Sequence, residues 1–150
     1  MIADIQPLFI KADMEVAEQL IGRERLRTSY NWKTMLQKGV HISGSSDAPV
    51  ESFDPRLAIY CAVTSKNLEG KPEGGWMPEQ RLTREEAVEL YTTGAAYTCY
   101  EEKIKGMLKE GFLADFIVMP EDIMTVKEER IQALPVDEVW VGGALVFSRS

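Results

Sequence analysis

The spacing of apolar residues changes near Lys105, and this change limits the possible folds more than any other feature of the sequence. Before Lys105, most apolar residues recur at the three- and four-residue intervals of amphipathic helices. After it, short apolar runs alternate with glycine-containing turns, as in short strands. We therefore expect an α/β chain with two parts: helices and one or two strands over 1–105, and a small all-strand part over 106–150.

Three helix starts are marked by capping residues in the first part. Asp13 precedes an amphipathic stretch and has the side chain of an N-cap, and Gly22 is expected to end that helix. Asp54 is followed by Pro55, the residue favoured at the first helical position. Thr83–Glu86 has the spacing of a capping box, in which each side chain covers a free backbone donor.

Two strands are expected among these helices. The apolar stretch Ile2–Ile10 suits a strand, although Pro7 interrupts it and proline is unfavourable in a central strand. Gly39–Gly44 is a short apolar run bounded by glycines, which is typical of a buried strand. The segment that follows it, 45–50, has the composition of a loop.

The last 45 residues are expected to form short strands that pair in one small sheet. Gly106–Leu108 and Ala114–Val118 are short apolar runs on either side of a turn. Val136–Val141 and Ala144–Phe147 flank Gly142-Gly143, a two-residue turn favoured in β-hairpins. We expect this sheet to be separate from the helical part.

Composition excludes several classes of protein. Hydrophobic residues make up 45% of the 150 residues, as in ordinary globular domains, and the net charge is −7. An acidic chain without a basic stripe is unsuited to nucleic acid and to anionic membranes. No apolar run approaches the roughly 20 residues of a membrane span. Cys61 and Cys99 lack metal-ligand spacing, so we expect two reduced thiols and a cytoplasmic protein.

Asp47 is the main candidate for chemistry. It lies just past the C-terminal end of the strand expected over Gly39–Gly44. Catalytic groups in α/β barrels occupy that edge. An aspartate in a loop also commonly caps a turn. The spacing alone leaves both roles open.

His41 and Trp76 have weaker claims to a functional role. His41, the only histidine, precedes Asp47 by six positions, roughly 20 Å in an extended chain, whereas metal ligands lie within about 2–2.5 Å of their ion. We therefore expect His41 to pack at the far end of the strand. Trp76 lies in a long loop, 67–81, where it either lines a substrate pocket or anchors the loop.

An ordered series of short motifs runs through nearly the whole chain. They are Ile5–Pro7, Gly44–Val50, Asp54-Pro55, Ile59–Thr64, Gly75-Trp76, Tyr91–Tyr97, Lys105-Gly106, Gly111–Val118 and Val139–Gly143. Any one of these motifs is weak, but their order is specific. In this order they resemble the amidohydrolase superfamily, and within it the amidohydrolase-3, YtcJ-like branch.

This resemblance implies a metal-dependent hydrolase of C–N bonds in small, amide-type substrates. Such enzymes have a distorted TIM-type α/β barrel that holds one or two divalent metal ions, often zinc, and a small flanking β-sandwich. Residues 1–105 would then supply the last two barrel strands with their helices, and 106–150 part of the sandwich. Asp47 matches the aspartate that follows the last barrel strand, which binds metal, accepts a proton from water and later protonates the leaving amine.

The sequence departs from the family pattern in its metal ligands. The His-x-His pair of the first strand, the bridging ligand and the two histidines of the middle strands are all missing. An eight-stranded α/β barrel typically needs about 250 residues. The chain, which begins almost directly on a strand, is therefore expected to be a C-terminal fragment that binds no catalytic metal and is inactive alone. The alternative is a non-catalytic remnant that self-associates through exposed edges or complements another chain.

Overall fold

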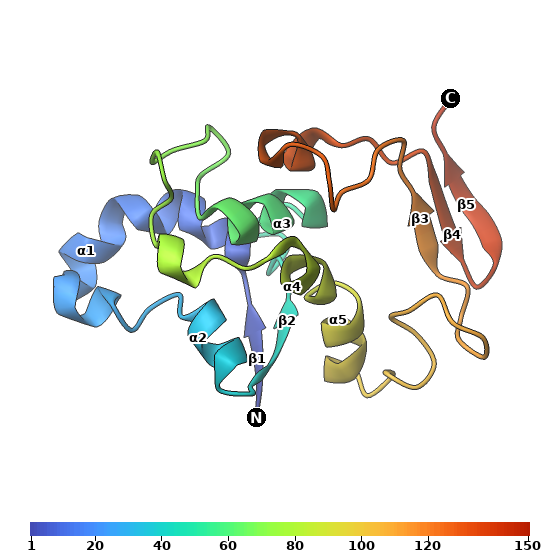
Figure 1. Cartoon of the computed structure of the whole chain (residues 1–150), viewed down its shortest axis with the longest axis horizontal. Coiled ribbons are helices and arrows are strands. Elements are labelled where there is room, and N and C mark those ends of the chain that lie inside the picture. The colour runs from blue at the N-terminus through green and yellow to red at the C-terminus, as the bar shows by residue number, and fades with distance from the viewer.

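A computed structural model describes residues 1–150 and shows a mixed α/β chain, as expected. Helices surround a pair of strands, and a separate three-stranded sheet lies at one end of the molecule (Figure 1). The elements in chain order are β1 (Ile2–Ile5), η1 (Pro7–Phe9), α1 (Ile10–Leu26), α2 (Trp32–Gln37), β2 (His41–Gly44), α3 (Pro55–Thr64), η2 (Pro78–Gln80), α4 (Arg84–Glu89), α5 (Thr93–Thr98), β3 (Phe116–Val118), η3 (Glu128–Ala133), β4 (Glu138–Val141) and β5 (Ala144–Ser148).

The strands β1 and β2 pair in parallel, with Ile2 opposite His41 and Ile5 opposite Gly44. A parallel pair needs a long crossover, and the helices α1 and α2 provide it. The first strand is shorter than expected: it ends at Ile5, and a 3₁₀ turn begins at Pro7, which cannot donate to a ladder. Both strands point the same way, so their carboxyl ends lie at one edge.

The expected start of the first helix is wrong. The helix α1 begins at Ile10, directly after the 3₁₀ turn, with Phe9 at the N-cap position. Asp13 therefore lies inside the first turn, where its carboxylate accepts a hydrogen bond from the Tyr30 hydroxyl. Gly22 has a φ of +78° and kinks the chain, but the helix resumes after it and ends at Leu26. The glycine breaks the helix without ending it.

The two other caps are confirmed. At the start of α3, the Asp54 carboxylate accepts a hydrogen bond of 3.0 Å from the Arg56 backbone N–H. At the start of α4, the Thr83 hydroxyl accepts from the Glu86 backbone N–H at 3.2 Å. The Glu86 carboxylate in turn accepts from the Thr83 backbone N–H at 2.7 Å, which completes the capping box.

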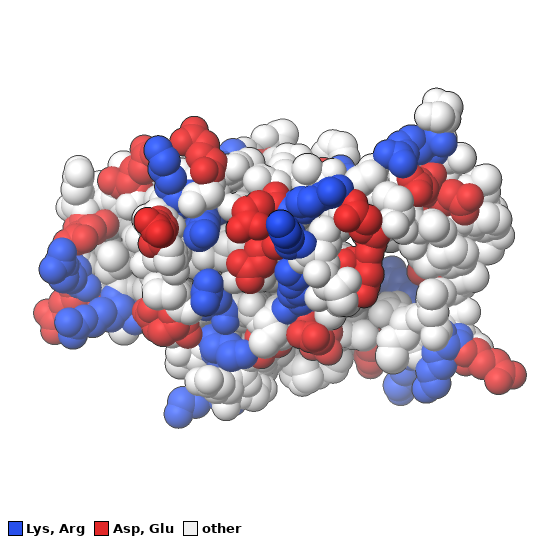
Figure 2. Space-filling model, turned by 45° about the horizontal axis from the view of Figure 1, so that its top comes forward, with Lys and Arg blue, Asp and Glu red and all other residues white.

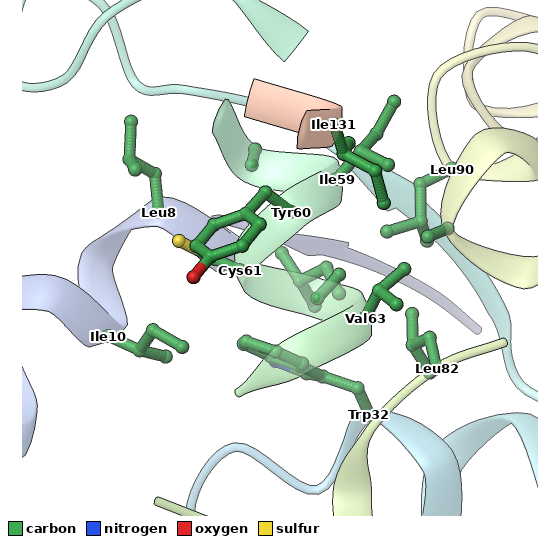
Figure 3. Close-up of a cluster of buried hydrophobic side chains, with 14 of the residues drawn as sticks. Leu8, Ile10, Trp32, Ile59, Tyr60, Cys61, Val63, Leu82, Leu90 and Ile131 are labelled. Atoms are coloured by element: carbon green, nitrogen blue, oxygen red, sulfur yellow. The ribbon is translucent and has the colours of Figure 1, made fainter. Parts of the chain in front are cut away.

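The helix α3 forms the centre of the hydrophobic core. Every residue from Ala58 to Thr64 is buried, so the helix is covered on all sides. Its neighbours in a cluster of 15 buried residues come from β1, η1, α1, α2, β2, α4, η3 and the loop before α4 (Figure 3). The largest fully buried side chains include Tyr60, Leu8, Ile10, Leu90 and Ile131.

The last third of the chain contains the expected sheet. The strands β3, β4 and β5 pair antiparallel in that order, separate from β1 and β2. The hairpin between β4 and β5 turns at Gly142 and Gly143, as predicted. A strand at Gly106–Leu108 was also expected, and that expectation is wrong. Gly106 has a φ of +94°, and a β-carbon there would lie 3.0 Å from the Thr92 carbonyl oxygen. The segment is thus a tight turn against α5.

Between β3 and β4 the chain leaves the sheet and returns to the core, which an all-strand tail does not predict. The 3₁₀ helix η3 packs against α3, and Ile131 and Leu134 are completely buried there. The Arg56 guanidinium, which forms an ion pair with Asp54, also donates a hydrogen bond to the Leu134 carbonyl. The connection therefore ties the tail of the chain to α3.

One face of the molecule shows no stripe of charge of one sign (Figure 2). On the face drawn in Figure 2, lysine and arginine side chains are interspersed with aspartate and glutamate over the helical part. The largest charge-poor area on this face lies over the three-stranded sheet. None of the helices combines the length and the apolar character that crossing a bilayer requires.

Candidate functional site

Asp47 lies three residues beyond the carboxyl end of β2, on an exposed turn. Its φ is +52°, in the left-handed region that aspartate adopts more readily than most residues. The turn closes through a 2.9 Å hydrogen bond from the Val50 N–H to the Asp47 carbonyl. The backbone of Asp47 is therefore hydrogen-bonded within the turn, whereas its side chain takes no part in closing it.

The Asp47 carboxylate differs from that of every other aspartate in the chain. It accepts no hydrogen bond and forms no ion pair within the protein. Each of the other six carboxylates has at least one such partner: Asp4, Asp13, Asp54, Asp115, Asp122 and Asp137. The role of a side-chain cap, which the sequence left open, is thus not the one that the structure shows. All the oxygen lone pairs of Asp47 remain available to an external partner.

Four polar side chains form a network next to this turn, and they were missed in the sequence. The Asp4 carboxylate accepts hydrogen bonds of 2.7 Å from both Ser43 and Ser45, one at each oxygen. The Gln6 amide donates to the Ser45 hydroxyl at 2.7 Å. The signal was present: alternate residues of a strand share a face, and Asp4 with Gln6 and Ser43 with Ser45 are such pairs.

His41 lies at the opposite end of β2 from Asp47, as expected. Its exposed imidazole stacks on Tyr97, with the ring centroids 4.0 Å apart. The structure therefore does not bring the only histidine to the same edge as Asp47.

Trp76 is half-buried in the long loop between α3 and α4. Its ring packs edge-on against Tyr30, with centroids 5.1 Å apart, and its backbone N–H donates to the Ser65 carbonyl at 2.7 Å. It also lines a hollow of about 670 Å³ whose lining residues do not include Asp47. These contacts anchor the loop, and the role in substrate binding stays a prediction.

Tyr91 closes the other face of the strand end. Its ring lies so close to Gly44 that a β-carbon there would be 2.6 Å from the ring. Burial, together with the negative charge of Asp4, raises the pKa of the Tyr91 hydroxyl, which has no hydrogen-bond partner. Gly44 thus permits a neutral aromatic side chain to pack directly beneath the edge that leads to Asp47.

The residues of this chain do not by themselves fit a metal ion. A structural or catalytic zinc site needs at least three protein ligands. No group of three histidine, cysteine, aspartate or glutamate side chains lies close enough together to hold a metal. At the edge in question the chain offers Asp47 as a free carboxylate, which fits as one ligand of a larger site.

Comparison with known proteins decides the family. The sequence model of the amidohydrolase family named Amidohydro_3 matches residues 1–147. The chain belongs to this family. It is 33% identical over 147 residues to the Bacillus subtilis protein YtcJ, whose name assigns it to the amidohydrolases, and the match covers 98% of the chain. The chain is also 26% identical to the N-substituted formamide deformylase of Arthrobacter pascens, in a match that covers 79% of the chain.

The amidohydrolase chain also matches solved structures. A metal-dependent hydrolase of Pyrococcus horikoshii, uncharacterized in activity, superposes with a TM-score of 0.73 at 32% identity over 83% of the chain. Guanine deaminase of Escherichia coli gives a TM-score of 0.60 over 80% of the chain, and at 21% identity it shows the fold alone. The resemblance seen in the sequence is confirmed, and the fold is that of the amidohydrolases.

The chain spans only a part of these relatives. It covers 28% of the length of YtcJ, 21% of the deformylase and 25% of the Pyrococcus horikoshii hydrolase. The remainder of each relative has no counterpart in these 150 residues.

Proposed function

We propose that the chain is the C-terminal portion of a metal-dependent amidohydrolase that cleaves C–N bonds of small, amide-type substrates. The observation that carries the proposal is the free carboxylate of Asp47 at the carboxyl end of a parallel strand, in a chain of this family. Family membership supports the reaction class. The name of the deformylase, which acts on N-substituted formamides, supports an amide-type substrate.

In this proposal Asp47 supplies one metal ligand and moves a proton. A free carboxylate oxygen accepts a proton from the attacking water and delivers it to the leaving nitrogen, a task that suits an exposed aspartate without competing donors. Asp47 would be one ligand of a divalent metal ion, zinc in our proposal, which in a complete site would supply a lowered pKa to bound water. The other ligands come from outside these 150 residues, so we expect the isolated chain to be inactive.

The same proposal assigns the parts of the fold. Residues 1–105, with β1 and β2, would be the last two strands of a distorted TIM-type barrel with their helices. Residues 106–150 would be part of the flanking sandwich. The parallel pairing of β1 and β2 with a helical crossover supports the first assignment, and the separate antiparallel sheet supports the second. Both cysteines are free thiols, which suits a cytoplasmic protein.

A second candidate function is a non-catalytic module that self-associates or complements another chain. Its support is the exposed apolar surface of the three-stranded sheet. Ile117, Val141 and Val146 are each more than half exposed, and β5 is an open edge without proline. Open edges and apolar faces of this kind favour pairing with another chain.

A chimera tests the first candidate. This chain would replace the matching 28% of YtcJ, and hydrolysis of N-formyl and N-acyl amines and zinc content would be measured. Asp47→Asn should lower kcat/KM by about 10²–10⁴ and should also lower zinc content. Glu110→Gln, an equal loss of one exposed carboxylate, should change neither. Unchanged activity and zinc content in the Asp47 variant would refute the proposal.

A further inference from the structure

We propose that Asp4 is a positioning residue that, with Gln6, holds Ser45 and so fixes the turn that presents Asp47. The inference rests on the proposed function for the importance of Asp47. It assigns no contact with substrate or metal to Asp4. Its basis is the network between β1 and the end of β2.

Three hydrogen bonds tie Ser45 to β1 and to Gln6, the residue that follows β1. Its backbone N–H donates to the Ile5 carbonyl at 2.9 Å. Its hydroxyl donates to the Asp4 carboxylate at 2.7 Å and accepts from the Gln6 amide at 2.7 Å. The first residue after β2 is thereby locked onto the neighbouring strand through both its backbone and its side chain.

Ser43 makes the matching contact without the same consequence. Its hydroxyl donates to the other Asp4 oxygen, also at 2.7 Å. Ser43 lies within β2, where the strand ladder and burial already fix the backbone. Ser45 lies outside the ladder, and only one residue, Ser46, separates it from Asp47. The same type of hydrogen bond to the same carboxylate therefore has a different importance at the two serines.

The two carboxylates near this edge, Asp4 and Asp47, differ in whether their oxygens already accept hydrogen bonds. Each oxygen of Asp4 already accepts a short hydrogen bond from a hydroxyl. The oxygens of Asp47 accept none, although its backbone is held in the left-handed region by the turn. Asp4 is engaged in holding the chain, and Asp47 is free to react.

The turn has its own reporter for an experiment. The Val50 N–H donates to the Asp47 carbonyl, so its hydrogen exchange measures how often the turn opens. The Gly44 N–H, which donates to the Leu90 carbonyl at 3.0 Å, reports on the strand instead. Both would be followed by NMR in the intact chain, together with the HN–Hα coupling of Asp47, which tracks its φ angle.

Asp4→Ala and Ser45→Ala should each speed Val50 exchange by about tenfold, since a hydrogen bond to a charged group is lost, and should change the Asp47 coupling. Ser43→Ala should leave both unchanged, and Ser45→Thr, which restores a hydroxyl, should rescue them. In Asp4→Ala and Ser45→Ala, Gly44 exchange should change less than Val50 exchange, which separates loss of positioning from loss of stability.

Two results would overturn the inference. One is an equal effect of Ser43→Ala and Ser45→Ala on Val50. The other is unchanged Val50 exchange in both Asp4→Ala and Ser45→Ala. Neither result bears on the reaction, because the chimera with Asp47→Asn tests that separately. Retained activity in that chimera would remove the function and leave the network intact.

Discussion

The core around α3 and the sheet of β3, β4 and β5 bury their apolar residues to very different extents. Cys61, Ala62 and Ile131 are completely inaccessible to solvent. In the sheet, the side chains of Ile117 and Val146 are 53% and 59% exposed, and no strand residue is buried. The first region completes its own core within the chain, whereas the second presents apolar side chains that the chain does not cover.

This difference indicates the region in which we expect pairing with another chain. A sheet with three strands gains stability from a hydrophobic face that is covered. Here η3, which lies between β3 and β4 in the sequence, packs mainly on α3. The sheet is thus the region that another segment or another copy would stabilise.

The largest contrast should appear in thiol reactivity. Cys61 is fully buried, and burial raises the pKa of its thiol to about 12, whereas Cys99 is exposed. Because the thiolate is the reactive form, a soluble maleimide or disulfide reagent should modify Cys99 faster by on the order of a thousandfold or more. Mass spectrometry after timed labelling would measure this. Comparable rates at the two thiols would mean that the core opens freely.

A matched pair of substitutions compares the two regions directly. Ile131→Ala removes a buried side chain and should lower the free energy of unfolding by about 2–5 kcal/mol. Ile117→Ala removes the same atoms from an exposed position in β3 and should cost less than about 1 kcal/mol. Urea unfolding of both variants tests this. An equally large loss at Ile117 would show that the sheet belongs to the main core.

Self-association should come from the sheet. Light scattering at micromolar concentration should show dimers or larger species, because β5 is an open apolar edge. Val146→Lys should shift the population towards monomer, since a charge on the edge opposes pairing. Leu20→Lys, on an exposed position of α1, should not. A monodisperse wild-type monomer would mean that the sheet needs no cover.

The smallest effect is expected where the connection between β3 and β4 is bound to the start of α3. A hydrogen bond from Arg56 lowers the pKa of Asp54, and Arg56 also binds the Leu134 carbonyl. A lowered pKa stabilises the fold above the ordinary aspartate pKa of about 3.9, and this stability is lost as pH falls through the lowered value. Asp54→Asn should therefore lower the free energy of unfolding at neutral pH. The difference in free energy of unfolding between this variant and the wild type should become smaller as the pH falls. Unfolding curves at several pH values would show it, and a difference independent of pH would contradict it.

Features of the fold that depend on neighbouring residues could be predicted from the sequence. Features that depend on contacts between distant segments could not. The caps at Asp54 and Thr83 and the hairpin at Gly142 depend on neighbouring residues, and sequence spacing reveals them. The start of α1 depends on a 3₁₀ turn that leads straight into the helix, so Asp13 was misassigned. Gly106 forms a turn because of its contact with α5, which no local pattern records.

The candidate site divides in the same way. The locations of His41 at the start of β2 and of Asp47 beyond its end follow from a strand that the sequence makes recognisable. The structure was needed to show that the Asp47 carboxylate has no partner, because this depends on all the segments that surround it. The contacts of Asp4 with Ser43 and Ser45 were only partly predictable. Strand alternation places Ser43 and Ser45 on one face, but only the parallel register of β1 with β2 brings them to Asp4.

Metal content of the purified, tag-free chain tests the central claim most directly. We propose that Asp47 is one ligand of a metal site that these 150 residues do not complete. Elemental analysis after extensive dialysis should therefore find far less than one zinc ion per chain, in the wild type and in Asp47→Asn alike. One tightly bound zinc per chain, lost on substitution of Asp47, would show instead that the chain forms a complete site by itself.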